Sequence, residues 1–155
     1  MVLISRSIEI DAPVEQVFSF FTKPENLLEI WPSMVEVSNA RSAPDGSHSF
    51  DWVYKMGGMR FRGHSDSIEV EKNKRVVSKN EKGIPSTFEY LYEKLGNRTR
   101  LTMNVDYSLP SQLLTKIADP VLRRINENEC EAVLANLKAR MEHRAVAAEQ
   151  PMASH

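Results

Sequence analysis

Hydrophobic and polar positions alternate through the middle of the chain, from Met34 onward. Alternation with a period of two is typical of strands that bury one face. Turn signals such as Gly57-Gly58 and Gly96-Asn97 separate the alternating segments. Because the links are short, we expect consecutive strands to pair antiparallel. The pattern predicts strands over Met34–Ser42, Ser47–Met56, Met59–Glu71, Arg75–Glu81, Ser86–Leu95 and Arg98–Ser108.

One further strand and two short helices are expected before this meander. Leu3–Ile10 alternates loosely and ends near Pro13, and proline favours the first turn of a helix. Apolar residues then recur at three- and four-residue spacing over Val14–Phe21, which predicts the first helix. Pro24–Ile30 predicts a second one, which Trp31-Pro32 ends because a residue that precedes proline favours extended backbone.

The last third of the chain has helical spacing. This spacing starts after Leu109-Pro110, continues to about Ala147 and is interrupted at Asp119-Pro120. Because Asp caps helices and proline fits their first turn, we expect a short helix before the break and a long one after it. We predict a single domain over residues 1–148 and a frayed tail over 149–155.

Composition excludes several classes of protein. The chain has 155 residues, a mass of 17.7 kDa and a formal net charge of -1, from 20 Lys+Arg and 21 Asp+Glu. Nucleic-acid binding is therefore not expected, since no net positive charge would attract phosphates. Apolar runs stay short of the roughly 20 residues that cross a membrane, so stable membrane insertion is not expected either. Without a secretion-like start and with Cys130 as the single cysteine, a cytoplasmic location is expected.

The order of these elements resembles the START-like (SRPBCC) superfamily, in particular its bacterial polyketide cyclase/dehydrase-like branch. The N-terminal resemblance lies in Ile8–Phe21 (IEIDAPVEQVFSFF), followed by Pro24-Glu25-Asn26 and Trp31-Pro32. Pro120–Arg124 and Glu131–Lys138 are similar to the closing helix of that branch. The resemblance implies an α+β helix-grip fold, in which a curved seven-stranded antiparallel sheet surrounds the C-terminal helix and two short helices lie between strands 1 and 2.

Members of the superfamily hold hydrophobic molecules between the sheet and this helix. The resemblance therefore implies binding of a hydrophobic or aromatic small molecule, lipid-like or polyketide-like. We also expect a monomer or weak homodimer without a cofactor. An aromatase/cyclase or dehydrase acting on a polyketide-like substrate is the first alternative. A protein-interaction module with a filled core is the second, because fold alone does not fix function.

Rows of aromatic and sulfur-containing side chains share one face of several predicted strands. The clearest row is Phe50, Trp52, Tyr54 and Met56, which alternates with polar positions. Such rows form either an ordinary core or the wall of a cavity in which tyrosine hydroxyls meet a ligand. The candidate ligand-binding residues are Trp31, Met34, Phe50, Trp52, Tyr54, Met56, Phe61, Phe88, Tyr90, Tyr92, Met103, Val105, Ile117, Val121 and Ile125.

The segment Met59–Glu71 has apolar residues at odd positions first and at even positions later. A regular strand cannot bury both sets, so the segment is expected to contain a bulge. A bulge near Gly63 would turn His64 and Asp66 inward as an acid-base pair. The alternatives are a bulge after Ser67, which would turn Ser65 and Ser67 inward, or a solvated histidine on a polar strand.

Glu129 is a further catalytic candidate. It falls within the apolar arc of the long helix, so it could face the cavity mouth as a carboxylate with a raised pKa. The alternative is a surface residue paired with a cation. His48 and His64 lie on neighbouring predicted strands without a third ligand, and no metal site is predicted.

Overall fold

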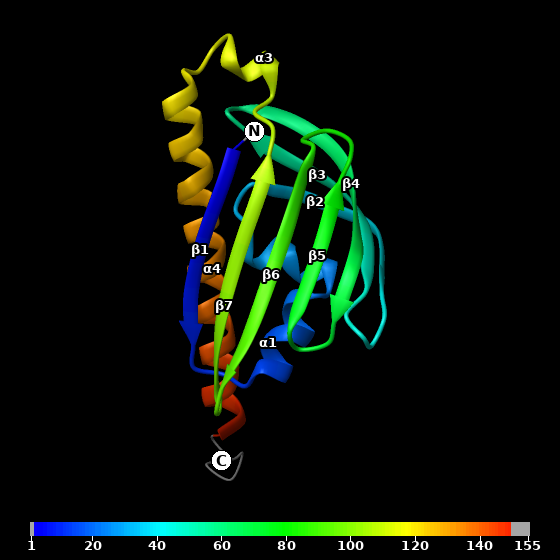
Figure 1. Ribbon diagram of the computed structural model, residues 1–155, viewed down its shortest axis with the longest axis vertical. Helices are drawn as coiled ribbons and strands as arrows, with labels where there is room; N and C mark the ends of the chain where they lie inside the picture. Colours follow the sequence, from blue (N-terminus) through cyan, green and yellow to red (C-terminus); the bar gives the residue numbers. More distant parts are fainter. Residues whose placement is uncertain (1, 150–155) are drawn as a thin grey trace.

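Seven strands form one antiparallel sheet in the computed structural model, which describes residues 2–149 (Figure 1). Their spatial order is β1-β7-β6-β5-β4-β3-β2, so neighbours in sequence are neighbours in space apart from β1, which pairs with β7. The strand bounds lie within one residue of those predicted from the alternation. They are β1 (Val2–Ile10), β2 (Met34–Ser42), β3 (His48–Met56), β4 (Met59–Glu71), β5 (Arg75–Asn80), β6 (Ser86–Leu95) and β7 (Arg98–Tyr107).

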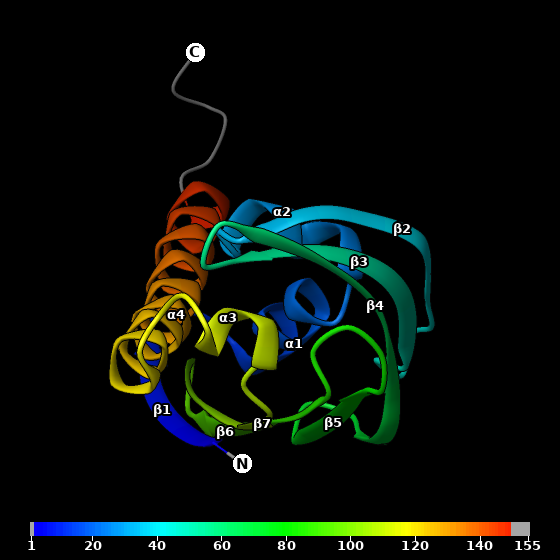
Figure 2. The same cartoon turned by 90° about the horizontal axis from the view of Figure 1, so that it is seen from above.

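The sheet curls strongly, and the helices fill and close its concave side (Figure 2). Helix α1 (Val14–Phe21), the 3-10 turn η1 (Pro24–Asn26) and α2 (Leu27–Ile30) connect β1 to β2. The short α3 (Ser111–Leu114) leads to the long α4 (Asp119–Glu149), which packs along β1. This arrangement confirms the predicted helix-grip fold. The predicted frayed tail lies outside the described residues from position 150 onward.

Helix α4 covers the sheet with one apolar stripe. Leu122, Val133, Leu137 and Met141 are at most 1% exposed. Their separations are close to multiples of 3.6, so they share one side of the helix. Asp119 was predicted to cap this helix. In the structure its carboxylate pairs with the Arg123 side chain one turn later instead. The pair lies in the helix's first turn, where an acidic side chain also suits the helix dipole.

The predicted bulge in β4 exists, but its predicted position was wrong. Gly63 pairs regularly with Trp52 of β3, and the irregularity falls between Ser67 and Glu69, where β4 pairs with β5. The alternative position, after Ser67, matches the structure. The parity argument placed Ile68 in the core, whereas this residue is 56% exposed at the bulge.

Candidate ligand-binding cavity

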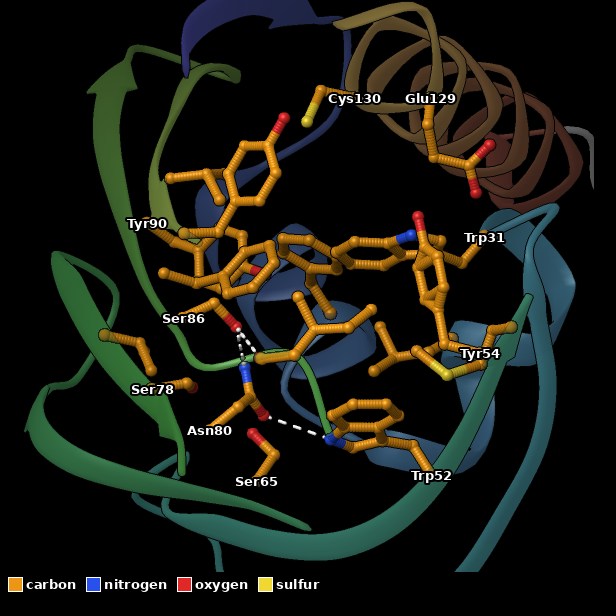
Figure 3. Close-up of a pocket in the computed structure, with 18 of the residues that line it drawn as sticks. Trp31, Trp52, Tyr54, Ser65, Ser78, Asn80, Ser86, Tyr90, Glu129 and Cys130 are labelled. Carbon is orange, nitrogen blue, oxygen red and sulfur yellow. Dashed lines mark hydrogen bonds between the residues drawn. The ribbon is translucent and has the colours of Figure 1, made fainter. Parts of the chain in front are cut away.

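A cavity of about 100 Å³ lies between the concave face of the sheet and α4 (Figure 3). The inward rows therefore do not form a completely filled core. Side chains from β1, from the α1–β2 segment, from β3 to β7 and from α4 line it. The lining residues are Ile4, Phe21, Thr22, Leu27, Trp31, Met34, His48, Phe50, Trp52, Tyr54, Met56, Ser65, Val76, Ser78, Asn80, Ile84, Ser86, Phe88, Tyr90, Tyr92, Val105, Tyr107, Asn126, Glu129 and Cys130.

Aromatic rings form most of the cavity wall. Trp31 meets Phe88 edge to face at 5.7 Å between ring centroids, and Phe88 stacks on Tyr90 at 6.0 Å. Phe21 meets Tyr90 edge to face at 4.7 Å. These separations lie within the range in which aromatic pairs attract. The contacts fix the rings of α1, the α2–β2 connection and β6 relative to one another, so the wall is largely preformed.

A chain of hydrogen bonds occupies the sheet end of the cavity. The Trp52 indole N–H donates to the Asn80 side-chain oxygen at 3.1 Å, and the Asn80 amide donates to Ser86 Oγ at 2.9 Å. Ser86 then donates to the Ile84 carbonyl at 2.9 Å. Asn80 is only 7% exposed, so the chain keeps a polar side chain satisfied where an unpaired one would be costly.

His48 lies at the same end and is neutral. Its Nδ1 donates to the Gly46 carbonyl at 2.9 Å, and its Nε2 accepts from the Ser78 hydroxyl at 3.3 Å. Burial lowers the pKa of His48, because the protonated ring would lose its hydration. A neutral imidazole beside a hydroxyl is the arrangement in this cavity that most resembles a general base.

The helix end of the cavity has a different chemistry (Figure 3). Glu129 of α4 faces the cavity, and its Oε2 accepts from the backbone N–H of Ser33 at 2.8 Å. The Tyr54 hydroxyl lies nearby, and burial together with the Glu129 carboxylate raises its pKa. The Trp31 indole N–H lies beside the Tyr54 hydroxyl in Figure 3 and lowers the pKa of that hydroxyl, against the effect of burial, but it completes no hydrogen bond of good geometry among the described residues.

Burial also keeps the other titratable groups of the wall neutral. It raises the pKa of the Cys130 thiol to about 12 and raises the pKa of Tyr90 and of Tyr92. A thiol with a raised pKa holds almost no thiolate at neutral pH, so Cys130 is not activated as a nucleophile. The cavity can therefore bind and orient a molecule, but its cysteine offers no covalent chemistry.

Five candidate ligand-binding residues do not line the cavity. Phe61 and Met103 are buried in the surrounding core, and Ile117 packs against the β3–β4 turn at Gly57. Val121 and Ile125 are 54% and 41% exposed. The apolar arc on the first turns of α4 is wider than the stripe that meets the sheet. Periodicity alone therefore assigned Val121 and Ile125 to the cavity side of the helix. The ten other candidates line the cavity.

His64 and Asp66 lie on the outer face of the sheet, so the prediction that they point inward was wrong. His64 Nδ1 is 2.7 Å from Asp51 Oδ1, and its Nε2 is 3.0 Å from Asp66 Oδ1. These contacts raise the pKa of His64, with Asp51 as the largest cause. His48 and His64 occupy opposite faces, and the described residues contain no cluster of three side chains that could hold a metal ion.

Sequence reasoning missed Ser78, Asn80 and Ser86 of the polar wall, whereas the alternative bulge after Ser67 turned the fourth residue, Ser65, inward. Short polar residues are typical of solvent-facing rows, so these three were not considered as part of a cavity wall. One signal was available. Val76, Ser78 and Asn80 have the same parity in β5, and a buried valine at the start of that row places the two polar residues on the inner face.

No helix among residues 2–149 has the length and apolar character needed to cross a membrane. Comparison with the curated proteins finds no match. Among solved structures, a protein of Thermus thermophilus is 17% identical, with a TM-score of 0.74 and coverage of 96% of this chain and 100% of that one. A START superfamily protein of Mycobacterium smegmatis is 16% identical, with a TM-score of 0.75 and coverage of 91% and 97%.

An aromatase/cyclase of Streptomyces sp. R1128 is also similar, with 15% identity, a TM-score of 0.73 and coverage of 95% of this chain and 97% of that one. At these identities the likeness extends to the fold. The family model described as "Polyketide cyclase / dehydrase and lipid transport" matches residues 1–142. The chain therefore belongs to the polyketide cyclase/dehydrase and lipid transport family.

Proposed function

We propose that this protein binds a hydrophobic or aromatic small molecule in the cavity between the sheet and α4. The observation that carries the proposal is an aromatic wall around free space, with the buried Trp31 N–H and Tyr92 hydroxyl lacking protein partners among the described residues. Buried polar groups normally have partners, so such groups indicate a place where a ligand or water completes them.

Apolar burial would supply most of the affinity. A single-ring molecule that buries about 150 Å² of apolar surface gains about 4 kcal/mol, at about 25 cal/mol per Å². The free space of about 100 Å³ favours a ligand whose buried part is about one ring in size. A larger lipid-like or polyketide-like ligand would require the wall to move.

An enzymatic role is the second candidate, and His48 is the observation that favours it. A neutral imidazole beside Ser78 could accept a proton from a bound polyketide-like chain, while the cavity orients that chain. His48→Ala should then abolish conversion of a linear polyketide analogue, whereas His64→Ala, on the outer face, should leave conversion unchanged. Equal conversion rates in the parent protein, His48→Ala and His64→Ala would contradict this role.

Fluorescence gives a direct test of binding, because the only two tryptophans, Trp31 and Trp52, both line the cavity. With excitation at 295 nm, ethylbenzene should change the emission saturably. Cys130→Phe, which fills the cavity beside Tyr90, should weaken binding at least tenfold. Val121→Phe, on the exposed side of the same helix, is the matched control.

Native mass spectrometry of the purified protein should in addition reveal a co-purified molecule. If no molecule co-purifies and neither ethylbenzene nor naphthalene changes the emission saturably, the binding proposal is wrong. The same result would favour an interaction module, the remaining alternative.

A further inference from the structure

The two ends of the cavity differ in how completely the protein satisfies its own polar groups. At the sheet end, Trp52 donates to Asn80, which donates to Ser86. Ser86 in turn donates to the Ile84 carbonyl, where the series ends. A ligand that displaced any of these bonds would have to replace it, with little net gain. The polar part of a ligand is therefore expected away from this series, where the unpaired groups of the lining are the Tyr92 hydroxyl and, at the helix end, the Trp31 N–H. Of these two places, the helix end also has a charged acceptor.

The helix end presents one free donor and one charged acceptor. Trp31 is 6% exposed, and its indole N–H has no partner among the described residues. Glu129 uses Oε2 to accept from Ser33, and no hydrogen bond within residues 2–149 reaches its Oε1. The Tyr54 hydroxyl lies on the same side of the cavity in Figure 3 and can either donate or accept.

The charge of the lining restricts the ligand further. Glu129 is the only Asp, Glu, Lys or Arg among the described residues that line the cavity, and His48 at the opposite end is neutral. An anionic ligand would leave water without meeting a cation, and its charge would be repelled by Glu129. Transfer of an unpaired charge into such a site is costly.

We propose that the cavity selects an uncharged apolar molecule whose polar group is a hydroxyl, held between the Trp31 N–H and the Glu129 carboxylate. A hydroxyl accepts from the indole and donates to the carboxylate, so it satisfies both groups. A carbonyl can only accept, an ammonium can only donate, and a carboxylate only accepts and carries the wrong charge. The inference rests on the proposed binding function and specifies its ligand class.

Four probes that share one ring separate the possibilities: ethylbenzene, 2-phenylethanol, 2-phenylethylamine and phenylacetate. Titrations at pH 7 followed by ¹H–¹⁵N NMR give dissociation constants, and the Ser33 amide reports directly on the group bonded to Glu129. We expect 2-phenylethanol to bind at least tenfold more tightly than phenylacetate and at least as tightly as 2-phenylethylamine.

Variants assign this preference to the two residues. Glu129→Gln keeps an acceptor for Ser33 but removes the charge, and should reduce the ratio between the alcohol and phenylacetate to below threefold. Glu127→Gln is the matched control, because Glu127 lies on the same helix but pairs with Arg6 and Arg124 outside the lining. Trp31→Phe removes the indole N–H, so it should weaken the binding of 2-phenylethanol at least threefold more than it weakens the binding of ethylbenzene.

Three results would overturn the hydroxyl proposal while ethylbenzene still binds: equal affinity for the alcohol and phenylacetate, equal effects of Glu129→Gln and Glu127→Gln, or a higher affinity for the amine than for the alcohol. The last result would indicate an ion pair with Glu129 instead. If ethylbenzene and the other three probes all fail to bind saturably, the proposed function itself fails, and the ligand class with it.

Discussion

The indole ring of Trp52 occupies the space directly over Gly63 on the neighbouring strand. The two residues pair across β3 and β4, and a Cβ placed on Gly63 would lie 2.2 Å from the Trp52 ring and 2.6 Å from the Lys82 carbonyl oxygen. Only glycine allows the ring to lie so close to β4. The contact sets the position of Trp52 at the sheet end of the cavity and of its hydrogen bond to Asn80.

Gly63→Ala should therefore destabilise the protein by about 1–3 kcal/mol or more, as overpacking of a closed site does. Gly58→Ala is a useful comparison, since Gly58 has nothing within 4 Å of a built Cβ and would suffer only from its positive φ of 83°. Urea denaturation followed by circular dichroism measures both. A loss at Gly63 no larger than that at Gly58 would contradict the steric argument.

The strand pairing explains why the sequence predicted the inner face of β3 correctly and the inner face of β4 incorrectly. In β3 every second residue from Phe50 to Met56 is large and apolar, so the inner face follows from period two alone. In β4 the bulge leaves Ile68 exposed, and an apolar residue that faces solvent reverses the parity argument. Exposure of a single isoleucine depends on the pairing with β5, which the local sequence does not encode.

Positions in the cavity were harder to predict than elements. The pattern could rank Glu129 only as a candidate, because its direction depends on where α4 crosses the α2–β2 connection. The unpaired N–H of Trp31 is likewise a property of the packed structure, since any tryptophan in sequence has the same donor. Periodicity therefore predicted the elements and much of the wall, and the family resemblance implied the helix-grip arrangement, whereas the polar chemistry required the tertiary contacts.

Asn80→Ala should be the most destabilising single change in the polar wall. It removes the acceptor of the Trp52 N–H and the donor to Ser86 together, and leaves a buried indole N–H unpaired. The expected loss is about 2–3 kcal/mol in the free energy of unfolding. Lys79→Ala, at the exposed neighbouring position of β5, should change stability by less than about 0.5 kcal/mol. Similar losses in both variants would mean that the hydrogen-bond chain contributes little.

Deletion from Pro120 should abolish cooperative folding. It removes Leu122, Val133, Leu137 and Met141, which are almost completely buried against the rest of the domain. At roughly 1.5–3 kcal/mol for each buried side chain, the loss equals the whole stability of a typical domain. A chain that ends at Glu149 should keep the melting temperature of the full-length protein. A cooperative thermal transition after deletion from Pro120 would contradict the expected role of α4.

The two histidines on neighbouring strands should change stability with pH in opposite directions. The pKa of His64 is raised above its ordinary value of 6.5 by hydrogen bonds to Asp51 and Asp66. Its contribution to stability is then fully present below pH 6.5 and is lost as pH rises through the folded-state pKa. Burial lowers the pKa of His48, so its contribution is present above pH 6.5 and is lost as pH falls through the folded-state pKa.

Urea denaturation of the parent protein, His64→Gln and His48→Gln between pH 5 and pH 8.5 tests these opposite signs. The stability advantage of the parent over His64→Gln should be largest at the acidic end and decline as pH rises above 6.5. Its advantage over His48→Gln should decline as pH falls below 6.5. Because His64 is partly exposed on the outer face, added salt should reduce its effect more than that of His48 in the cavity wall. Parallel pH profiles for the two variants would contradict the assignment of one ring to each face of the sheet.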